Sequence, residues 1–245
     1  MRARAIVAAM GLSVIAGAPA LADQAGSADN GRHVYTYSVL HPLYGKIGTY
    51  TDTIERSAET TRIEGCLRIA VKVLGLVAYR MESNTTEIMH GDRLVSLRSD
   101  TDKDGLQLEV HGEARGDQFL VSGTGGSFAG PANIAPTDPW VLKRAGEKTV
   151  VFTDTGRIFN VLISGGEYET VSVNGASVSA RHFVIMGLRR QEVWLDGREI
   201  PIMFRIVEDG TPVDFVLQGP TAEPVMASAP PIQRTALRRP ESGAR

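Results

Sequence analysis

The chain has 245 residues, with 26 Lys or Arg against 28 Asp or Glu, so its formal net charge is −2 at pH 7. This mildly acidic balance gives no reason to expect nucleic acid as a partner. Cys66 is the single cysteine, which excludes an intramolecular disulfide and leaves stability to an ordinary hydrophobic core.

Residues 1–22 have the pattern of a cleavable secretory signal peptide. Arg2 and Arg4 form a charged start, an apolar run follows, and Ala-Leu-Ala at positions 20–22 supplies a small-x-small cleavage site. The apolar run is too short for a membrane span, and no second run follows it. We therefore expect an exported, periplasmic protein that is cleaved near Ala22 and has no transmembrane segment.

Residues 32–219 alternate between apolar and polar types with a period of two, as in the stretch His33–Leu40. Short runs rich in Val, Ile, Thr and Phe are separated by dipeptides that favour tight hairpins: Asn174-Gly175, Asp104-Gly105, Asp196-Gly197 and Asp209-Gly210. We predict a single all-β domain, an antiparallel, strongly curved sheet or open β-barrel of about ten to twelve strands joined by hairpins.

Three segments do not follow this pattern of short alternating strands. The long apolar run Cys66–Tyr79 is predicted to form one strand with a bend or bulge, because it is rich in β-branched residues and contains Gly75. The irregular stretch Ser122–Trp140 forms either a lid over the barrel mouth or the crossing between two halves of the sheet. Residues 220–245, rich in Pro, Ala and Arg, are predicted to form a disordered tail.

The stretch Ser99–Glu113 begins like a calcium loop, because Asp100, Asp102 and Asp104 alternate and Gly105 follows them. An EF-hand loop ends in a bidentate glutamate, whereas His111 occupies that position here, and strands rather than helices are expected on both sides. We interpret the stretch as a hairpin turn, with a metal site at the three aspartates as the less favoured alternative.

No motif for catalysis stands out, so we assign no catalytic residue and expect no cofactor. Arg181 and His182 are adjacent in a strand, so one of them should face the interior and need an acidic partner. That partner is either a bound ligand or a carboxylate from a neighbouring strand. Trp140 and Trp194 either line an apolar pocket or cap the core. These four side chains are our candidate ligand-binding residues.

Several motifs occur in an order that resembles a family of exported proteins of unknown function, found chiefly in alphaproteobacteria and similar to a wider group of uncharacterised periplasmic β-proteins. The resemblance covers Tyr35 to Leu217 and implies a curved antiparallel sheet or open barrel, without catalytic residues. The matching positions are Tyr37, Val39, Gly45, Ile47 and Gly48, then Asp92, Arg93, Leu94, Val95, Thr101, Asp102 and Gly105, and finally Trp194, Asp196 and Gly197.

Three functions remain open at this point. The leading hypothesis is a non-enzymatic binder or carrier of an apolar or amphiphilic, lipid-like ligand in a β half-barrel, which a cavity lined by Trp194 and aliphatic side chains would favour. The alternative is a structural or interaction protein of the cell envelope, favoured by a solid core with an exposed apolar edge. The third is an envelope hydrolase, favoured by clustered buried carboxylates or by His182 paired with an acid in a cleft.

Overall fold

The computed structural model describes residues 31–219, and this part of the chain folds into strands joined by turns and loops. The strands are β1 (Arg32–His41), β2 (Gly45–Arg56), β3 (Thr60–Val73), β4 (Leu76–His90), β5 (Arg93–Lys103), β6 (Leu106–Arg115), β7 (Gln118–Gly123), β8 (Gly126–Pro131), β9 (Ala135–Pro136), β10 (Gly146–Val151), β11 (Ile158–Val173), β12 (Ala176–Met186), β13 (Arg190–Leu195), β14 (Pro201–Glu208) and β15 (Thr211–Leu217).

All fifteen strands belong to one sheet with the order β8-β7-β6-β5-β4-β3-β2-β1-β15-β14-β13-β12-β11-β10-β9. Each strand pairs with the next strand of the chain except β8, which does not pair with β9. At the centre of the sheet the first and last strands pair, with Tyr37 opposite Leu217. The two edge strands, β8 and β9, are consecutive in the chain. The predicted all-β, strongly curved open barrel is confirmed, although it has more strands than the ten to twelve that we expected.

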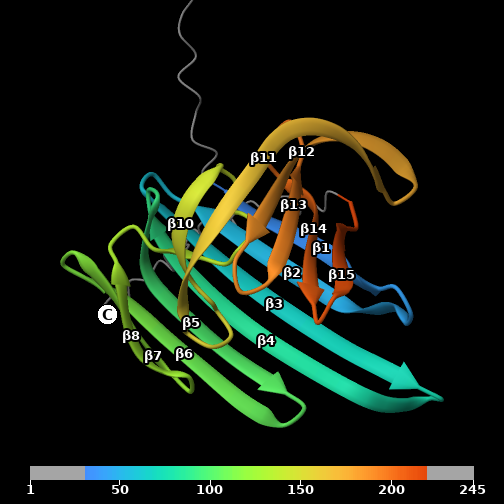
Figure 1. Cartoon of the computed structure of the whole chain (residues 1–245), viewed down its shortest axis with the longest axis horizontal. Coiled ribbons are helices and arrows are strands. Elements are labelled where there is room, and N and C mark those ends of the chain that lie inside the picture. The colour runs from blue at the N-terminus through green and yellow to red at the C-terminus, as the bar shows by residue number, and fades with distance from the viewer. Residues whose placement is uncertain (1–30, 220–245) are drawn as a thin grey trace, which may run out of the picture.

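The sheet curls so that its two halves face each other. Figure 1 shows strands β1–β8 as a broad curved layer in blue to green, with β10–β15 in yellow to red lying over it. The main core cluster joins the halves, since Tyr37 and Val39 of β1 pack with Ile163, Phe183 and the other buried side chains of the second half. Burial of these apolar side chains drives the closure.

Residues 132–145 run from β8 to β10 and include the short edge strand β9, which pairs with β10 in parallel. Ile134 and Leu142 are 0% and 1% exposed, and each joins a different core cluster. Our interpretation of Ser122–Trp140 as one irregular stretch is wrong for residues 122–131, which form the end of β7 and the strand β8. The rest of the stretch belongs to the crossing between the two halves, the second of our two alternatives, and its apolar side chains help to fill the barrel. This crossing also supplies residues of the candidate site.

The apolar run Cys66–Tyr79 forms a hairpin, so our prediction of a single bent strand is wrong. Leu74 and Gly75 turn the chain with φ angles of 51° and 83°. Positive φ at both central residues is the type I′ geometry that joins twisted strands. Leucine rarely adopts this conformation, which is why the turn carried no recognisable signal in the sequence. Leu74 is 98% exposed at its tip.

Three of the four predicted tight turns are confirmed: Asp104-Gly105, Asn174-Gly175 and Asp209-Gly210 all have positive φ at both residues. Asp196-Gly197 instead opens a longer loop, in which the Asp196 backbone N–H donates to Ile200 O. The Asp196 side chain accepts hydrogen bonds from the backbone N–H groups of Arg198 and Ile200, which holds this loop in place of a two-residue turn.

Candidate ligand-binding cavity

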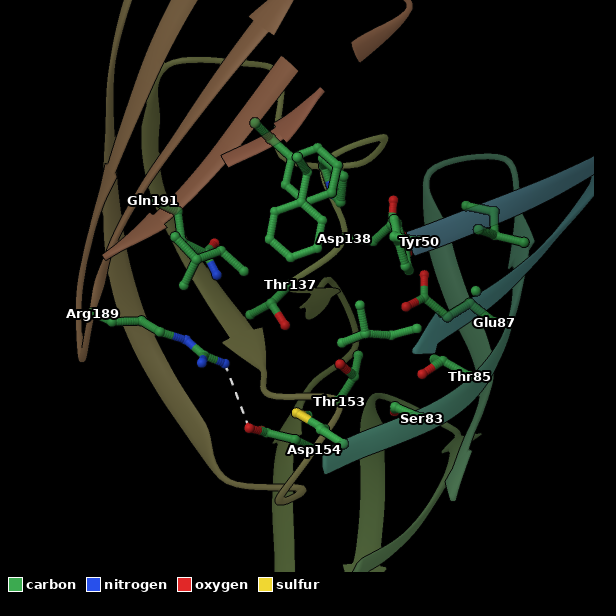
Figure 2. A pocket seen from close by; sticks show the side chains of 18 residues that line it. Tyr50, Ser83, Thr85, Glu87, Thr137, Asp138, Thr153, Asp154, Arg189 and Gln191 are labelled. Carbon is green, nitrogen blue, oxygen red and sulfur yellow. Dashed lines mark ion pairs between the residues drawn. The ribbon is translucent and has the colours of Figure 1, made fainter. Parts of the chain in front are cut away.

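A cavity of about 150 Å³ lies inside the curled sheet. One wall is formed by β2, β3 and β4, and the opposite wall by β14, β15 and the start of β13, with part of the crossing segment between them. Ser83, Thr85 and Glu87 line it from β4, and Gln191 faces them from β13 (Figure 2). Apolar side chains, among them Phe204, complete the opposite wall.

The two-residue period of the strands explains why polar side chains point inward here. On β4, Ser83, Thr85 and Glu87 occupy alternate positions, so their side chains project from the same face. The Ser83 hydroxyl lies 2.6 Å from the hydroxyl of Thr101, and the Thr85 hydroxyl lies 3.3 Å from that of Ser99, both on β5. The hydroxyl groups therefore satisfy one another across the strands, whereas Glu87 continues the row without such a partner.

Three buried carboxyl groups interact electrostatically beside one end of the cavity: Glu87 of β4 and Asp138 of the crossing, which line it, and Asp52 of β2, which does not. The Trp140 indole Nε1–H donates to Asp52 Oδ2 at 2.9 Å, and the Trp140 backbone N–H donates to Asp138 Oδ1 at 2.7 Å. Tryptophan 140 thus orients two of the three carboxyl groups.

Burial raises the pKa of all three carboxyl groups, because a charged carboxylate is poorly solvated there. The pKa of Asp138 rises to about 7. Repulsion from Asp138 further raises the pKa of Asp52 and of Glu87, while the hydrogen bonds from Tyr50 and Trp140 oppose the rise at Asp52. Asp138 is therefore largely protonated below neutral pH and gains negative charge as the pH rises through about 7.

Several polar atoms around the cavity lack a partner. Within residues 31–219, Glu87 Oε2, Asp154 Oδ1 and Arg189 Nε are buried without a hydrogen bond, although Arg189 pairs through its Nη atoms with Asp154 and Glu208. Buried polar groups in proteins are normally hydrogen-bonded, to the protein or to a bound molecule. Glu87 is only 2% exposed, so bulk water does not satisfy it.

Gly65 of β3 keeps space open beside the acidic end. A Cβ atom at this position would lie 2.9 Å from the Tyr50 hydroxyl and 3.4 Å from Asp52 Oδ1. Because the backbone φ of Gly65 is not in the left-handed region, the space and not the backbone conformation is what a larger side chain would change. Gly65 therefore sets the shape of this end of the cavity.

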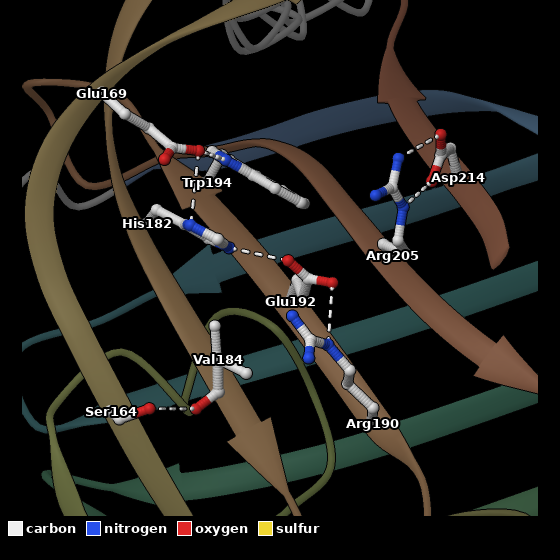
Figure 3. Close-up of polar contacts among 9 residues, drawn as sticks. All are labelled: Ser164, Glu169, His182, Val184, Arg190, Glu192, Trp194, Arg205 and Asp214. Atoms are coloured by element: carbon white, nitrogen blue, oxygen red, sulfur yellow. Dashed lines mark hydrogen bonds and ion pairs between the residues drawn. The ribbon is translucent and has the colours of Figure 1, made fainter.

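Of the four predicted ligand-binding side chains, His182 and Trp194 lie side by side on β12 and β13 (Figure 3). Trp194 projects from the face of β13 opposite to that of Gln191, which lines the cavity. Their rings stack with centroids 4.3 Å apart and an interplanar angle of 6°. His182 Nε2 lies 2.9 Å from Glu192 Oε2, and its Nδ1 lies 3.3 Å from Glu169 Oε1, which also accepts the Trp194 indole N–H. A carboxylate from a neighbouring strand, our second alternative, is thus the partner of His182.

The other two lie elsewhere. Arg181 pairs with Glu199 at 3.3 Å and stacks over the Phe183 ring, on the opposite face of β12 from His182. Trp140 packs against Tyr35 in the crossing region, and it belongs to a different hydrophobic cluster from Trp194. The structure therefore does not bring the four residues into one site, and their role in ligand binding stays a prediction.

The aspartate-rich stretch forms the β5–β6 hairpin that we expected. Asp102 accepts hydrogen bonds from the Gly105 backbone N–H and the Gln107 side chain, and Asp104 accepts one from the Arg80 backbone N–H. Asp100 lies 3.8 Å from Arg98. Within residues 31–219, no group of three His, Cys, Asp or Glu side chains is arranged to hold a metal ion.

Sequence reasoning missed the acidic end of the cavity. A signal for it exists, because Asp52 shares its strand face with Tyr50 and Ile54, and Glu87 shares its face with Met89, a buried apolar residue. Burying a carboxylate at a position that alternation assigns to the core costs free energy, so such a residue indicates a functional site. The fact that Asp52, Glu87 and Asp138 meet depends on the sheet closing, which the local pattern does not reveal.

The fold and the cavity together define a class of protein: an open β-barrel-like sheet with a buried crossing segment and a small, partly acidic interior cavity. The chain belongs to the family described as Domain of unknown function (DUF6134), whose pattern matches residues 44–218. This membership confirms the expected family of unknown function. The predicted export of its members and their bacterial group stay predictions.

Among solved structures, the fold is similar to that of a beta-barrel-like protein of domain of unknown function DUF1849 from Brucella abortus. The TM-score is 0.58 at 11% sequence identity, and the match covers 77% of this chain and 96% of that one. At this identity the likeness concerns the fold alone. A comparison with curated proteins finds none that matches the chain. Within residues 31–219, no helix has the length and apolar character to cross a membrane.

Proposed function

We propose that this protein is a non-enzymatic binder of a small amphiphilic ligand, held in the interior cavity with a cationic or hydrogen-bond-donating group at the acidic end. The observation that carries the proposal is the buried Glu87 Oε2, which lines the cavity without a hydrogen-bond partner in the described chain. A hydrogen-bond donor on the ligand supplies the partner that Glu87 Oε2 lacks. The apolar wall around Phe204 accommodates the rest of the molecule.

The volume of the cavity sets the size of the ligand. An apolar cavity of roughly 150 Å³ accommodates a molecule about as large as benzene. The cavity here has that volume, about 150 Å³, so a compact amine or a similar end group fits better than a whole lipid. The ligand is thus smaller than the lipid-like molecule that we expected from the fold.

The charge of the ligand follows from the carboxyl groups. An ammonium group beside Glu87 and Asp138 stabilises their ionised forms, so binding releases protons wherever the empty site would hold them. Because the pKa of Asp138 in the empty site is about 7, the affinity for an amine should rise as the pH increases from about 6 to about 8. A carboxylate ligand should show the opposite preference.

The test is a calorimetric titration of the protein with benzylamine, benzyl alcohol and benzoate, three probes of similar size that differ in charge. We expect benzylamine to bind tightest, with proton release visible as a dependence of the heat on the buffer. Glu87→Gln and Gly65→Ala should each weaken benzylamine at least tenfold, about 1.4 kcal/mol. Equal affinity for benzylamine and benzoate would overturn the proposal.

Matched controls are available for both substitutions. Glu82 is on the same strand as Glu87 but pairs with Arg80 outside the cavity, so Glu82→Gln should leave benzylamine binding unchanged. Gly197 has no atom near its missing Cβ, so Gly197→Ala controls for the loss of a glycine. A loss of binding in these variants as large as in the cavity variants would contradict the assignment of the site.

The hydrolase is the second candidate, because clustered buried carboxylates at a cavity are the feature that favours it. A carboxyl group with a pKa of about 7, such as Asp138, is suited to general acid–base chemistry near neutral pH. A cavity lined by Trp194 would have favoured the carrier, but Trp194 does not line this cavity. Incubating the protein with esters, amides and glycosides of benzylamine size separates the candidates: turnover that Glu87→Gln abolishes favours the hydrolase.

Export to the periplasm is part of the proposal and rests on the sequence of residues 1–22. Those residues lie outside the part that the structure describes, as do residues 220–245. N-terminal sequencing of the protein from its native host should give Asp23 or a neighbouring residue as the first position, with the protein in the periplasmic fraction. An intact Met1 in the cytoplasmic fraction would contradict export.

A further inference from the structure

A second pocket of about 280 Å³ opens on the other side of the crossing segment from the interior cavity. Ile63 lines both pockets, and the crossing contributes Asp138 to the cavity but Trp140 to the second pocket. Residues 138–140 and Ile63 thus form a wall between two separate spaces. We call the second space the basic pocket, for the side chains at its rim.

Its floor is apolar and buried. Ile54, Ile63, Met89 and Trp140 line the pocket from β2, β3, β4 and the crossing, and all four are buried. The Trp140 ring is held firmly, because its indole N–H donates to Asp52 and its face packs against Tyr35. A rigid aromatic and aliphatic floor of this kind binds an apolar group of a ligand.

The rim is basic, although the chain as a whole carries a formal net charge of −2. Its cationic side chains are Arg56, Lys143, Arg144 and Lys148, against one acid, Asp92. Lys143 is already paired with Glu199 at 2.7 Å, and Arg144 lies 3.9 Å from Asp92, both exposed enough for solvent to weaken the pair.

Two of the rim cations have no acidic partner among the residues that the structure describes. Among residues 31–219, no carboxylate lies within ion-pair distance of Arg56 or of Lys148. Two unpaired cations at the edge of an apolar floor attract an anionic group, because the opposite charge is supplied by nothing else in the described chain. An isolated anion would pair with the cations but would not contact the apolar floor, and a neutral apolar molecule would contact the floor but would not pair with the cations.

We propose that the basic pocket binds an anionic amphiphile, a molecule that carries a carboxylate or phosphate group on an apolar body. The anionic group lies at the rim between Arg56 and Lys148, and the apolar body packs on Trp140. Its volume of about 280 Å³ is close to the lower end of typical ligand pockets, which suits a short chain or a single ring. This site is independent of the interior cavity and takes a ligand of the opposite charge.

The experiment uses the full chain carrying Trp194→Phe, which leaves Trp140 as the one tryptophan and its fluorescence as the signal of binding at the floor. The probes are octanoate, octyl phosphate, octylamine and inorganic phosphate. We expect saturable one-to-one binding of octanoate and octyl phosphate, at least tenfold weaker binding of octylamine, and no saturation with inorganic phosphate. Comparing the affinities for octanoate and octyl phosphate shows whether the pocket prefers a carboxylate or a phosphate group.

Variants then assign the binding to the rim. Arg56→Gln combined with Lys148→Gln should weaken octanoate at least tenfold, whereas the charge-conserving pair Arg56→Lys and Lys148→Arg should retain it. Arg98→Gln combined with Arg115→Gln removes the same charge from exposed positions far from the pocket lining and should have no effect. Glu87→Gln removes one carboxyl group from the proposed amine site in the interior cavity and should leave octanoate binding unchanged.

Specific results would contradict the proposed binding of an anionic amphiphile in the basic pocket. Equal affinities for octanoate and octylamine would overturn the proposal, because the rim charge would then play no part. Octanoate binding that survives the glutamine pair would place the ligand elsewhere. Should the glutamine pair fail to unfold cooperatively, the charge-conserving pair and the octylamine comparison still decide the question. Loss of octanoate binding in Glu87→Gln would show that the two pockets are one site.

Discussion

At the scale of the residue, single buried carboxyl groups define the candidate site. Glu87 and Asp138 are acids inside a β sheet whose other inward positions are mostly apolar or hydroxyl-bearing. Burying such a group costs free energy unless it is neutral or paired, and here burial raises the pKa of both. The chain therefore retains an unfavourable feature at one place, which is typical of a binding or catalytic site.

The stability of the protein should depend on pH through these groups. The folded chain holds protons on them at pH values where the unfolded chain has released them, so the free energy of unfolding falls as the pH rises. This contribution is fully present below the ordinary carboxyl pKa of about 4 and is lost as the pH rises through about 7 for Asp138. Urea denaturation at a series of pH values measures it.

Glu87→Gln should flatten this pH dependence, because glutamine has nearly the same shape and does not titrate. The slope should lose up to about 1.4 kcal/mol per pH unit between the ordinary glutamate pKa of about 4 and the raised pKa of Glu87, where the folded chain holds a proton that the unfolded chain has released. The variant should accordingly be more stable than the parent at about pH 8. An unchanged slope would mean that Glu87 is ionised in the folded protein throughout, against the raised pKa that its burial implies.

At the scale of the element, the β3–β4 hairpin combines an unfavourable turn with an apolar tip. Leu74 adopts a φ of 51° although leucine avoids the left-handed region, and it is almost wholly exposed. Its neighbours Val73, Leu76 and Val77 are also exposed. The hairpin forms because the long β3–β4 ladder, from Thr60 opposite His90 to Val73 opposite Leu76, holds the two strands in register.

Leu74→Asn should stabilise the protein by about 1 kcal/mol, since Asn-Gly is the preferred pair for a turn with positive φ at both positions. The measurement is the free energy of unfolding in urea. Leu76→Asn is the matched control, because Leu76 is similarly exposed but lies in the strand, where asparagine is unfavourable. A Leu74 variant no more stable than the parent would indicate that turn strain contributes little here.

The crossing segment is the element that converts an open sheet into a filled barrel. Leu142 is 1% exposed and belongs to the main core, so Leu142→Ala should destabilise the protein by about 2–5 kcal/mol through lost burial and a residual cavity. Leu43→Ala, at an exposed turn between β1 and β2, should change stability by less than about 0.5 kcal/mol. A small effect at Leu142 would show that the crossing contributes little to the core.

For the whole molecule, the pairing of the first and last strands decides whether the sheet is continuous. β15 lies between β1 and β14, and its Phe215 stacks on Phe204 with ring centroids 4.3 Å apart. Phe215 also belongs to the main core cluster, so the C-terminal strand joins the halves of the sheet through both hydrogen bonds and apolar contacts.

A chain that ends at Gly210 lacks β15 and should lose cooperative unfolding, because β1 and β14 would no longer be bridged. A chain that ends at Gly219 keeps all fifteen strands and, if residues 220–245 form the predicted tail, should melt within a few degrees of the full chain. Circular dichroism on heating distinguishes the two. Cooperative melting of the shorter chain would contradict the role of β15.

Much of the fold could be predicted because its causes are local. Alternation along His33–Leu40 in β1 predicts which side chains share a face, and Asp104-Gly105 predicts a turn through the conformations these residues tolerate. The candidate site was not predictable in this way. Glu87 and Asp52 are individually visible as polar residues on core faces, yet their meeting with Asp138 requires a crossing segment whose path has no periodic signal.

By itself, the sequence determined the all-β class, three of the hairpin turns and the absence of a disulfide, since these follow from side-chain alternation, backbone conformational preference and a single cysteine. The tertiary structure decided the β1–β15 pairing, the turn at Leu74-Gly75, and the two pockets on either side of Trp140. These depend on contacts between residues far apart in the chain, where the gain from long-range burial outweighs local preference.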